Sequence, residues 1–371
     1  MRFDVAEWVK NGAVIADGGT GTMLQSRGLG GEGTETWCLT HPEELLRLHR
    51  EYLAAGAMWL KTNTFGANRL NYPAGLRELI FAAVALAKLA AEDQIPVLLS
   101  VGPTGRLLEP YGDLPFEDAV AIFREAIAFG AGAGADAILI ETFSDTQEAR
   151  AAIIAAKEAA PDLPIFCSLT FEENGRLLSG ATPEAAAAIL EGLGVAALGL
   201  NCGAGPARAI KILPRLAAAA HVPLLVNPNA GLPRVENGRA VFDLPPEDFA
   251  AQAEQLLALG ASILGGCCGT TPAHIDALSK RLKGKKTLPP PIKTEEVIAS
   301  PREVVLISQT DDLEEYDPEE PGFEPVKITC GGPTELEALL REYNGKALVI
   351  APDWAESLVK KYGGVLRCCA R

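Results

Sequence analysis

The 371-residue sequence predicts an α/β protein, a (β/α)8 TIM barrel followed by a small C-terminal α/β appendage. Three observations lead to this prediction. Eight short apolar segments bounded by Gly or Pro recur along most of the chain. A segment with helical periodicity follows each one, and a polar, glycine-containing motif follows nearly every apolar segment. Eight such strand–helix units match the size of a (β/α)8 barrel, whose chemistry lies at the carboxyl ends of its strands.

The apolar segments are rich in Val, Ile and Leu, as the buried strands of a parallel sheet are. In chain order, we expect strands at Ala13–Asp17, Met58–Asn63, Pro96–Val101, Ala137–Glu141, Pro164–Thr170, Ala196–Asn201, Pro223–Asn227 and Ala261–Gly266.

The segments between these strands are rich in Ala and carry apolar residues at helical spacing. Two of them have clear start signals, Asp145 before Thr146 and Thr182 before Pro183, because such residues cap the first turn of a helix. We expect helices at Glu44–Ala55, Leu76–Glu92, Phe116–Ala128, Thr146–Ala160, Pro183–Glu191, Ala207–Ala219 and Pro246–Leu259.

A doubly wound open sheet is the alternative to a barrel. Eight units exceed the usual strand count of such a sheet, and no dinucleotide-binding motif opens the chain. The glycines at 130, 132 and 134 precede an expected strand instead of following one, so we interpret them as a helix end and a close-packing turn. The barrel is therefore favoured.

The chain divides into three parts by composition. We expect the barrel at residues 1–285, a Pro-rich linker at 286–300 and a small α/β extension at 301–371. The extension is too short to form a robust core alone, so it should pack against the barrel. Cys368-Cys369 lies near its end, and we expect this pair in a frayed surface tail, a second metal or redox site being the other hypothesis.

Composition excludes several classes of protein. A hydrophobic content of 48% predicts a well-filled core, and a net charge of −15 argues against nucleic acid or an anionic membrane as the main partner. The sequence shows neither a signal peptide nor an apolar stretch of the ~20 residues that span a membrane. We therefore expect a cytoplasmic protein, in which the eight cysteines are thiols or metal ligands rather than disulfides.

Three cysteines follow strands that belong to the same barrel face. Cys202 comes at the end of the sixth expected strand, and Cys267 and Cys268 follow the eighth. Adjacent cysteines rarely bond each other, because that disulfide would strain the peptide between them. Three thiolates leave one vertex of a tetrahedral zinc ion open, as in catalytic sites. A thiolate-rich zinc is a weak Lewis acid, so this Zn2+ site favours activation of a substrate thiol over activation of water.

Other strand-end residues suit an amino-acid substrate. Asp17 and Glu141 are carboxylates that can hold an ammonium group. The turn formed by Gly18, Gly19 and Thr20 can direct backbone N–H groups at a carboxylate. The strand-end asparagines either touch the substrate or fix backbone turns; they are Asn63, Asn201 and Asn229. Thr271 and Pro272 are expected to begin a helix whose dipole stabilises the thiolates of the preceding turn.

The ordered set of these motifs resembles the homocysteine S-methyltransferase family. The motifs are Asp17–Thr22 (DGGTGT), Thr62–Ala67 (TNTFGA), Gly102–Gly105 (GPTG), Glu141–Asp145 (ETFSD), Asn201-Cys202, Pro228–Gly231 (PNAG) and Gly265–Pro272 (GGCCGTTP). The likeness extends to about residue 285, and it is greatest to the homocysteine-binding barrel module of cobalamin-dependent methionine synthase.

The resemblance implies a zinc-bearing barrel that methylates L-homocysteine to methionine. By the same resemblance Cys202, Cys267 and Cys268 hold the metal, while Asp17, Gly18 and Glu141 contact the amino-acid part of homocysteine. No catalytic residue is expected beyond the metal site.

The methyl donor is expected to come from outside the chain. The sequence has no Asp-x-His-x-x-Gly signature for cobalamin and no room for the folate and cobalamin modules of methionine synthase. We therefore expect methylcobalamin on a separate corrinoid protein, or a small methylated sulfonium or ammonium compound.

Two alternatives remain open at this point. Within the enzyme class, the acceptor is another thiol, or the reaction runs in reverse as demethylation of a thioether. In a different class, the chain is a non-catalytic zinc-binding or redox-sensing partner of a corrinoid methyltransferase complex.

Overall fold

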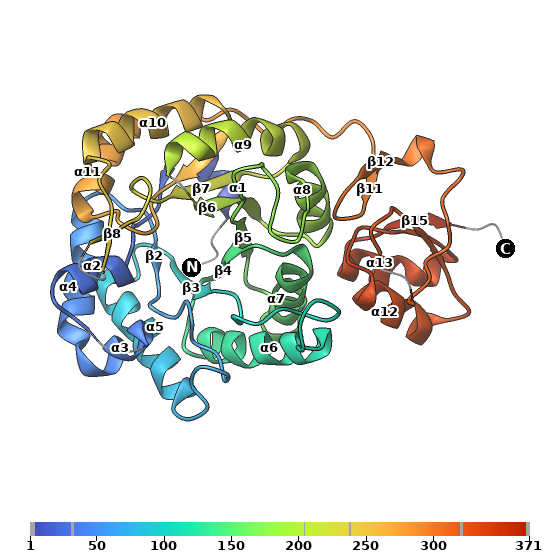
Figure 1. Ribbon diagram of the computed structural model, residues 1–371, viewed down its shortest axis with the longest axis horizontal. Coiled ribbons are helices and arrows are strands. Elements are labelled where there is room, and N and C mark those ends of the chain that lie inside the picture. The colour runs from blue at the N-terminus through green and yellow to red at the C-terminus, as the bar shows by residue number, and fades with distance from the viewer. Residues whose placement is uncertain (1–3, 31–32, 204, 237–238, 320–321, 369–371) are drawn as a thin grey trace.

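The computed structural model describes residues 4–30, 33–203, 205–236, 239–319 and 322–368. Its centre is an eight-stranded parallel sheet that curls into a (β/α)8 barrel, which confirms the predicted fold class (Figure 1). The strand order is β1-β10-β7-β6-β5-β4-β3-β2. The strands are β1 (Val14–Ile15), β2 (Leu60–Lys61), β3 (Val97–Val101), β4 (Ala137–Phe143), β5 (Ile165–Leu169), β6 (Ala197–Cys202), β7 (Leu224–Pro228) and β10 (Ala261–Leu264).

The barrel closes between its two shortest strands, β1 and β2. The backbone N–H of Met58 donates to the carbonyl oxygen of Ile15 at 2.7 Å. Two residues beyond Ile15, the carboxylate of Asp17 accepts from the backbone N–H of Lys61 at 2.8 Å. A side chain of the expected substrate site thus forms part of the closing seam.

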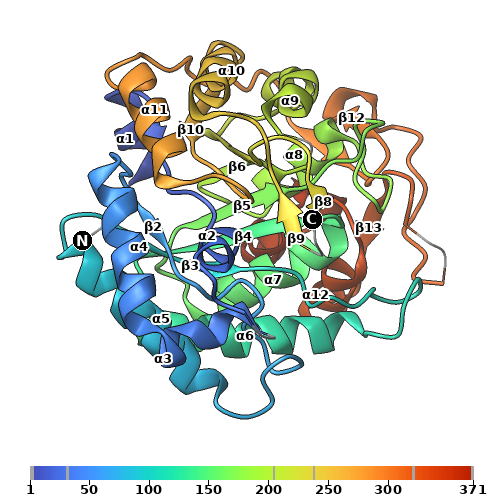
Figure 2. The same cartoon turned by 60° about the vertical axis from the view of Figure 1, so that its left-hand side comes forward.

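Helices cover the outside of the sheet between successive strands (Figures 1 and 2). Asp145 and Thr182 cap their helices as predicted, each accepting a hydrogen bond from a backbone N–H of the first turn. The barrel helices are α4 (Pro42–Ala54), α5 (Leu76–Ala91), α6 (Phe116–Gly132), α7 (Thr146–Ala159), α8 (Pro183–Gly192), α9 (Pro206–Ala219), α10 (Pro246–Ala258) and α11 (Pro272–Leu282). Shorter elements in the loops are α2 (Gly21–Ser26), α3 (Trp37–Thr40), the 3-10 turn Thr34–Thr36 and the hairpin of β8 (Arg234–Glu236) with β9 (Arg239–Val241).

The glycine-rich segment after α6 acts as a helix end, as expected. Gly134 has φ +97°, a left-handed conformation that favours glycine, directly beyond the helix. Gly130 lies so close to Leu99 of β3 that a side chain there would collide with it. The segment therefore ends the helix and packs it tightly on the sheet.

The barrel interior forms its own apolar cluster, with Trp59, Leu98, Leu139 and Phe166 among its fully buried members. The rings of Trp59 and Phe166 meet edge to face with their centroids 5.4 Å apart. The N-terminal helix α1 (Val5–Lys10), which the sequence did not predict, adds Val5 and Val9 to this cluster. The interior is thus a packed core, and space for ligands lies at the strand ends.

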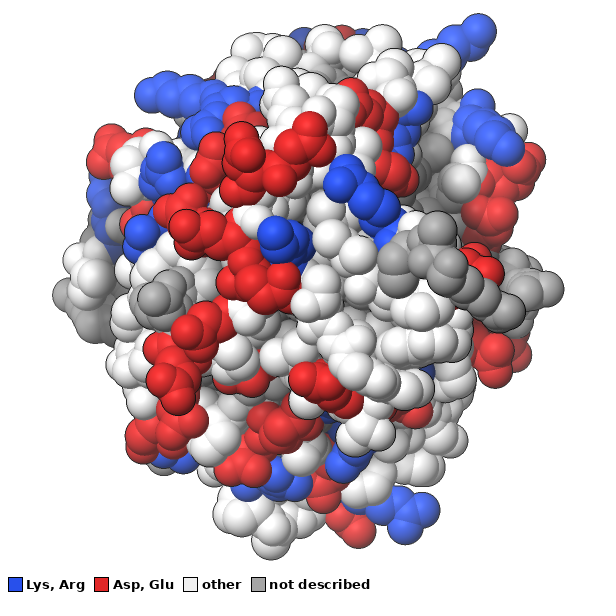
Figure 3. All heavy atoms as spheres, turned by 90° about the vertical axis from the view of Figure 1, so that its right-hand side faces the viewer, with Lys and Arg blue, Asp and Glu red and all other residues white. Residues whose placement is uncertain are grey.

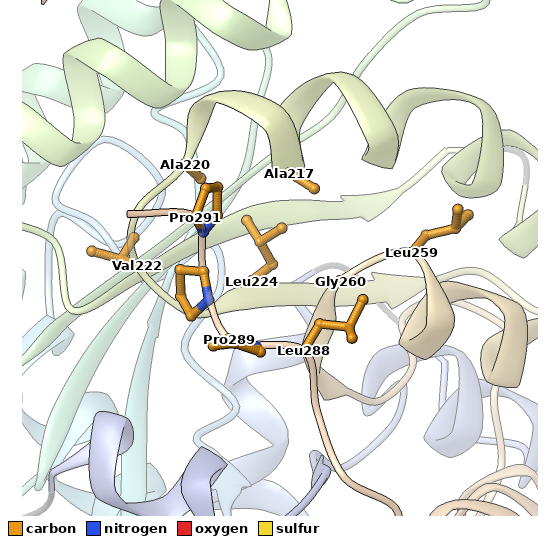
Figure 4. Close-up of a pocket in the computed structure, with 10 residues that line it drawn as sticks. Ala217, Ala220, Val222, Leu224, Leu259, Gly260, Leu288, Pro289 and Pro291 are labelled. Carbon is orange, nitrogen blue, oxygen red and sulfur yellow. The ribbon is translucent and has the colours of Figure 1, made fainter. Parts of the chain in front are cut away.

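An apolar hollow of about 290 Å³ lies at the opposite, amino end of β7 and β10 (Figure 4). The proline segment at residues 289–291 crosses it and lies against Val222 and Leu224. Its lining residues are Ala, Val, Leu, Gly and Pro, none of which has an ionising side chain. The hollow is therefore an apolar packing site for the linker, and its lining residues include no side chain that could act as an acid, base or nucleophile.

The C-terminal unit (residues 297–319 and 322–368) packs beside α7 and α8 (Figures 1 and 2). It contains an antiparallel hairpin of β11 (Val297–Ala299) and β12 (Val304–Leu306). A separate parallel sheet has the strand order β13-β14-β15. The remaining elements are β13 (Lys327–Thr329), α12 (Pro333–Glu342), β14 (Leu348–Ala351), α13 (Glu356–Tyr362), β15 (Val365–Cys368) and 3-10 turns at Ile307–Gln309 and Asp353–Ala355.

A buried arginine joins this unit to the barrel. Arg150 of α7 donates to the carbonyl oxygens of Gly345 at 2.7 Å and Leu340 at 2.8 Å, and 1% of it is exposed. Arg341 of α12 pairs with Glu158 of α7 at 2.8 Å. The extension therefore leans on the barrel, as the sequence predicted.

Acidic side chains spread over the outer face of the C-terminal unit (Figure 3). The run from Asp311 to Glu324 contributes several of them, and its described carboxylates are exposed. Cys368 is the last residue of β15, so the expectation of a frayed tail is wrong for this residue, because it pairs with Ala351 of β14. Cys369 lies outside the described residues. Among the helices that the structure describes, none is long and apolar enough to cross a membrane.

Candidate functional site

A cavity of about 440 Å³ opens at the carboxyl ends of the barrel strands. This is the face at which barrel enzymes carry out their chemistry. Its walls come from the ends of six strands, β1, β2, β3, β4, β6 and β10, and the loops that follow them: Gly18, Gly19, Thr20, Gly21, Thr22, Gln25, Thr34, Lys61, Thr62, Asn63, Phe65, Ser100, Glu141, Thr142, Cys202, Cys267 and Cys268.

The structure brings the three predicted metal ligands together in one wall of this cavity. The sulfur atoms of Cys202, Cys267 and Cys268 all lie within 4.8 Å of one another. Zinc–sulfur bonds are about 2.3 Å long, so two sulfurs of one tetrahedral zinc ion lie about 3.8 Å apart. The three side chains are therefore close enough to share one zinc ion after small shifts. In the described part of the chain, no other group of three His, Cys, Asp or Glu residues meets this geometry.

The turn that carries Cys267 and Cys268 is held by backbone hydrogen bonds. Cys267 N–H donates to the carbonyl of Pro228 at 2.9 Å, and the Thr270 hydroxyl donates to the carbonyl of Cys267 at 2.6 Å. Gly19 N–H in turn donates to that hydroxyl at 3.0 Å. A Cβ atom on Gly19 would lie 2.5 Å from the carbonyl oxygen of Cys267. The glycine turn after β1 and the cysteine turn after β10 therefore depend on each other.

This arrangement changes one expectation for the glycine turn. The N–H group of Gly19 is already used by Thr270, so it is not free to bind a substrate carboxylate. Gly18, Gly19 and Thr20 nevertheless line the cavity, and their backbone forms part of its wall.

The helix after the cysteines begins as predicted, with Thr271 as N-cap and Pro272 in the first turn. His274 takes the place of the usual Glu or Gln in a capping box, since its Nδ1 lies 3.2 Å from the Thr271 N–H. The amino end of α11, with its partial positive charge, thus follows the cysteine turn directly.

Two residues beside the reactive groups have strained backbones. Cys202 has φ +61° and Thr142 has φ +70°, both in the left-handed region that non-glycine residues rarely occupy. The Asn201 side chain supports Thr142, since its Oδ1 accepts from Thr142 N–H at 2.9 Å and its Nδ2 donates to the hydroxyl at 2.7 Å. The local backbone is therefore shaped to present Glu141 and Cys202.

The asparagines occupy different positions relative to the cavity. Asn63 lines it and donates to the carbonyl of Thr34 at 2.8 Å. Asn201 and Asn229 are buried outside its lining, where they bond to neighbouring loops. This geometry favours the turn-fixing alternative for Asn201 and Asn229.

The three thiols influence one another's protonation. Hydrogen bonds from Cys267 and Cys268 lower the pKa of Cys202, while hydrogen bonding to Cys202 raises the pKa of both partners. The three ionisations are thus coupled, so that loss of one thiol proton makes loss of the next harder. A metal ion bound there would displace the remaining protons, because metal ligands must be deprotonated.

A buried lysine, which the sequence analysis did not single out, lies between the two predicted carboxylates. Lys61 Nζ is 3.7 Å from Asp17 Oδ1 and 3.8 Å from Glu141 Oε2, and 8% of its side chain is exposed. It also donates to the carbonyl of Gly266 at 3.4 Å. Its signal in the sequence is a charged residue that directly follows the apolar residues Met58, Trp59 and Leu60 within an expected strand.

The structure separates the two carboxylates by depth. Glu141 lines the cavity and accepts from the hydroxyl of Ser100, a second residue missed from the sequence, at 2.5 Å. Asp17 is fully buried below the cavity lining, where burial raises its pKa to about 7. Burial also raises the pKa of Glu141. Burial alone would lower the pKa of Lys61, but Glu141 and Asp17 outweigh it and raise that pKa. The charges of Asp17, Lys61 and Glu141 therefore depend on one another.

Comparison with known proteins identifies relatives of the barrel. Residues 14–282 match the profile of the family described as homocysteine S-methyltransferase. Two proteins named methionine synthase, from Mycobacterium tuberculosis (strain ATCC 25618 / H37Rv) and Mycobacterium leprae (strain TN), are 36% and 35% identical over 295 residues. The alignments cover 73% of this chain but 25% and 24% of those proteins, so the chain spans about a quarter of their length.

A solved structure has a similar fold. The homocysteine methyltransferase MmuM from Escherichia coli, in its metallated form, is 28% identical with a TM-score of 0.64. The match covers 74% of this chain and 98% of that one.

Proposed function

Because the chain belongs to the homocysteine S-methyltransferase family, we propose that it methylates the thiol of L-homocysteine to give methionine, with Zn2+ held by Cys202, Cys267 and Cys268. The observation that carries the proposal is the position of these three sulfurs in the wall of the strand-end cavity. A family match without that cluster would support the fold but not the chemistry.

Zinc bound there would hold the incoming thiol as a thiolate at neutral pH, where a free thiol with a pKa near 8.5 is mostly protonated. The chain's own residues contribute position and environment. Asn229 and Thr270 hold the ligand loops, and the cavity walls would orient the acceptor beside the three sulfurs. Fixing two reactants in line in this way lowers the entropic part of the barrier.

The remainder of the cavity suits the amino-acid part of the acceptor. Glu141, held by Ser100, presents a carboxylate in the wall for the α-ammonium group. Asn63 and Thr142 add polar groups nearby. We assign Asp17 a supporting role below the wall, where it orients Lys61 and closes the barrel seam.

The methyl donor is proposed to enter through the open mouth of the cavity. Phe65 lies there with 43% of its surface exposed, and it also lines the cavity. Methylcobalamin on a separate corrinoid protein is the first donor to test, since the relatives named methionine synthase extend well beyond the aligned region. A small methyl donor is the other.

The test combines metal analysis with turnover. Purified protein should contain one zinc per chain and form methionine from homocysteine with at least one of methylcobalamin, S-methylmethionine, S-adenosylmethionine, betaine or methyltetrahydrofolate. Cys202→Ser should lose both zinc and activity, whereas Cys330→Ser, in the C-terminal unit, should keep both. Zinc binding without methionine from any donor would instead favour a non-catalytic zinc protein.

A further inference from the structure

The cavity contains a single cationic side chain among its lining residues, and that side chain is Lys61. Its ammonium group faces two carboxylates, yet neither contact is a tight hydrogen bond. The distances of 3.7 Å to Asp17 and 3.8 Å to Glu141 exceed the 2.7–2.9 Å that charge-assisted hydrogen bonds adopt. Its one hydrogen bond, to Gly266, is long at 3.4 Å.

The ammonium group of Lys61 therefore has unused donor capacity. A lysine has three N–H donors, and burial makes unmet donors costly. The Asp17 Oδ1 atom beside it is likewise buried without a hydrogen bond. An anionic group in the cavity could accept from these unused donors at hydrogen-bonding distance.

Among the lining residues, side chains such as Gln25, Asn63 and Thr142 could also donate to such an anion, but none besides Lys61 carries a positive charge. The N–H of Gly19 is occupied by Thr270, and Glu141 would repel a negative group. The α-ammonium group of an acceptor would be attracted less strongly than by two free carboxylates, because Lys61 already neutralises part of the charge of Asp17 and Glu141. An anionic group of the acceptor should therefore bind at Lys61. For a cationic group the cavity wall offers Glu141, whose charge Lys61 partly neutralises.

We propose that Lys61 binds the carboxylate of the acceptor, so that the site takes thiol acids as a class and the α-amino group is secondary. Homocysteine is then one member of that class. This inference rests on the proposed function, because it concerns the acceptor of the same site.

Three thiols of equal chain length test the proposal on the unmodified zinc-loaded protein. Homocysteine carries both groups, 4-mercaptobutanoate lacks the amine, and 3-mercaptopropan-1-amine lacks the carboxylate. We expect calorimetric titration to give a dissociation constant for 4-mercaptobutanoate that is within about 10-fold of the dissociation constant for homocysteine. The amine should bind about 10-fold to 100-fold more weakly than the acid, as loss of one charge-assisted hydrogen bond implies.

Variants at position 61 supply the second readout. Lys61→Gln should weaken 4-mercaptobutanoate about 10-fold or more while leaving 3-mercaptopropan-1-amine equal or tighter. Lys61→Arg, which keeps the charge, should preserve the preference for the acid. Zinc content and circular dichroism check each variant, and if Lys61→Gln does not fold, the analogue order on the unmodified protein decides.

The outcomes separate this inference from the function it rests on. Tighter binding of the amine than of the acid by the unmodified protein, with homocysteine bound, would overturn the role of Lys61 alone. An unchanged acid-to-amine ratio in folded Lys61→Gln would do the same. Failure of all three thiols to bind zinc-loaded protein would overturn the proposed function itself.

Discussion

The side chain of Asn229 bridges the two loops that carry the cysteines, with its Oδ1 accepting from the backbone N–H of Cys268 at 3.0 Å. Its Nδ2 donates to the carbonyl of Gly203, next to Cys202, at 2.7 Å. One buried amide thus sets the separation of the sulfur ligands without touching a metal ion itself.

Replacement of Asn229 should therefore weaken metal binding. In Asn229→Ala both bridging hydrogen bonds are lost, and we expect zinc affinity to fall about 10-fold to 100-fold, as for other residues that orient ligands. Competition with a chromophoric chelator measures the change. Asn174→Ala, at an exposed loop position, is the matched control and should bind zinc normally. Equal affinity in the two variants would contradict the bridging role.

A methyl group at position 19 should disturb the cysteine turn. In Gly19→Ala the new Cβ would lie 2.5 Å from the carbonyl oxygen of Cys267, so the turn must move. We expect a loss of about 1–3 kcal/mol in the free energy of unfolding, as for other overpacked sites, together with weaker zinc binding. Denaturant titration and zinc analysis test both effects. Gly30→Ala, where a Cβ meets nothing within 4 Å, should change neither.

Removal of Arg150 should loosen the C-terminal unit. Arg150→Ala leaves the carbonyls of Gly345 and Leu340 without their buried donor, and we expect a loss of about 3 kcal/mol in unfolding free energy. Limited proteolysis should then cut residues 283–296, which contain no helix or strand in the structure, faster than in the unmodified protein. Arg124→Ala removes only an exposed pair with Glu158 and should cost less than about 1 kcal/mol.

His49 should make stability depend on pH. It is 1% exposed in α4, and burial lowers its pKa to about 4 from an unfolded value of 6.5. Between these pH values the unfolded chain binds more protons, so the free energy of unfolding rises with pH up to 6.5. The full loss below pH 4 is about 3 kcal/mol.

Denaturant titrations of His49→Gln across this range should show a flatter pH dependence than the unmodified protein. Leu48→Met, at a buried neighbouring position that does not ionise, should retain the original slope. If the slope of His49→Gln matches that of Leu48→Met, another group causes the pH dependence.

Much of the barrel was predictable because its signals are local. Apolar segments, Pro and Thr caps and glycine turns gave the strands and most helix starts, such as Pro183 and Pro246, within a few residues. The approach of Cys202 to Cys267 followed from the convergence of strand ends on one barrel face. The barrel fold and the approach of these cysteines could therefore both be predicted by counting the strands along the sequence.

The remainder depends on contacts distant in sequence. Arg150 bonds to carbonyls 190 and 195 residues further along the chain, and nothing near it in sequence indicates burial. The role of Lys61 depends on which way a two-residue strand faces at the barrel seam. The depth of Asp17 relative to Glu141 depends on the same closure of the barrel. The sequence motifs therefore identified both carboxylates but could not predict that only Glu141 lines the cavity.

The closing seam also connects ligand binding to folding. Strands β1 and β2 meet through the Met58–Ile15 hydrogen bond and through Asp17, whose carboxylate contacts both the backbone and the ammonium group of Lys61. An acceptor that binds Lys61 would therefore stabilise the junction between the two shortest strands of the sheet. By thermodynamic linkage, a saturating acceptor should raise the melting temperature of the whole barrel, and mutations that open the seam should weaken acceptor binding in return.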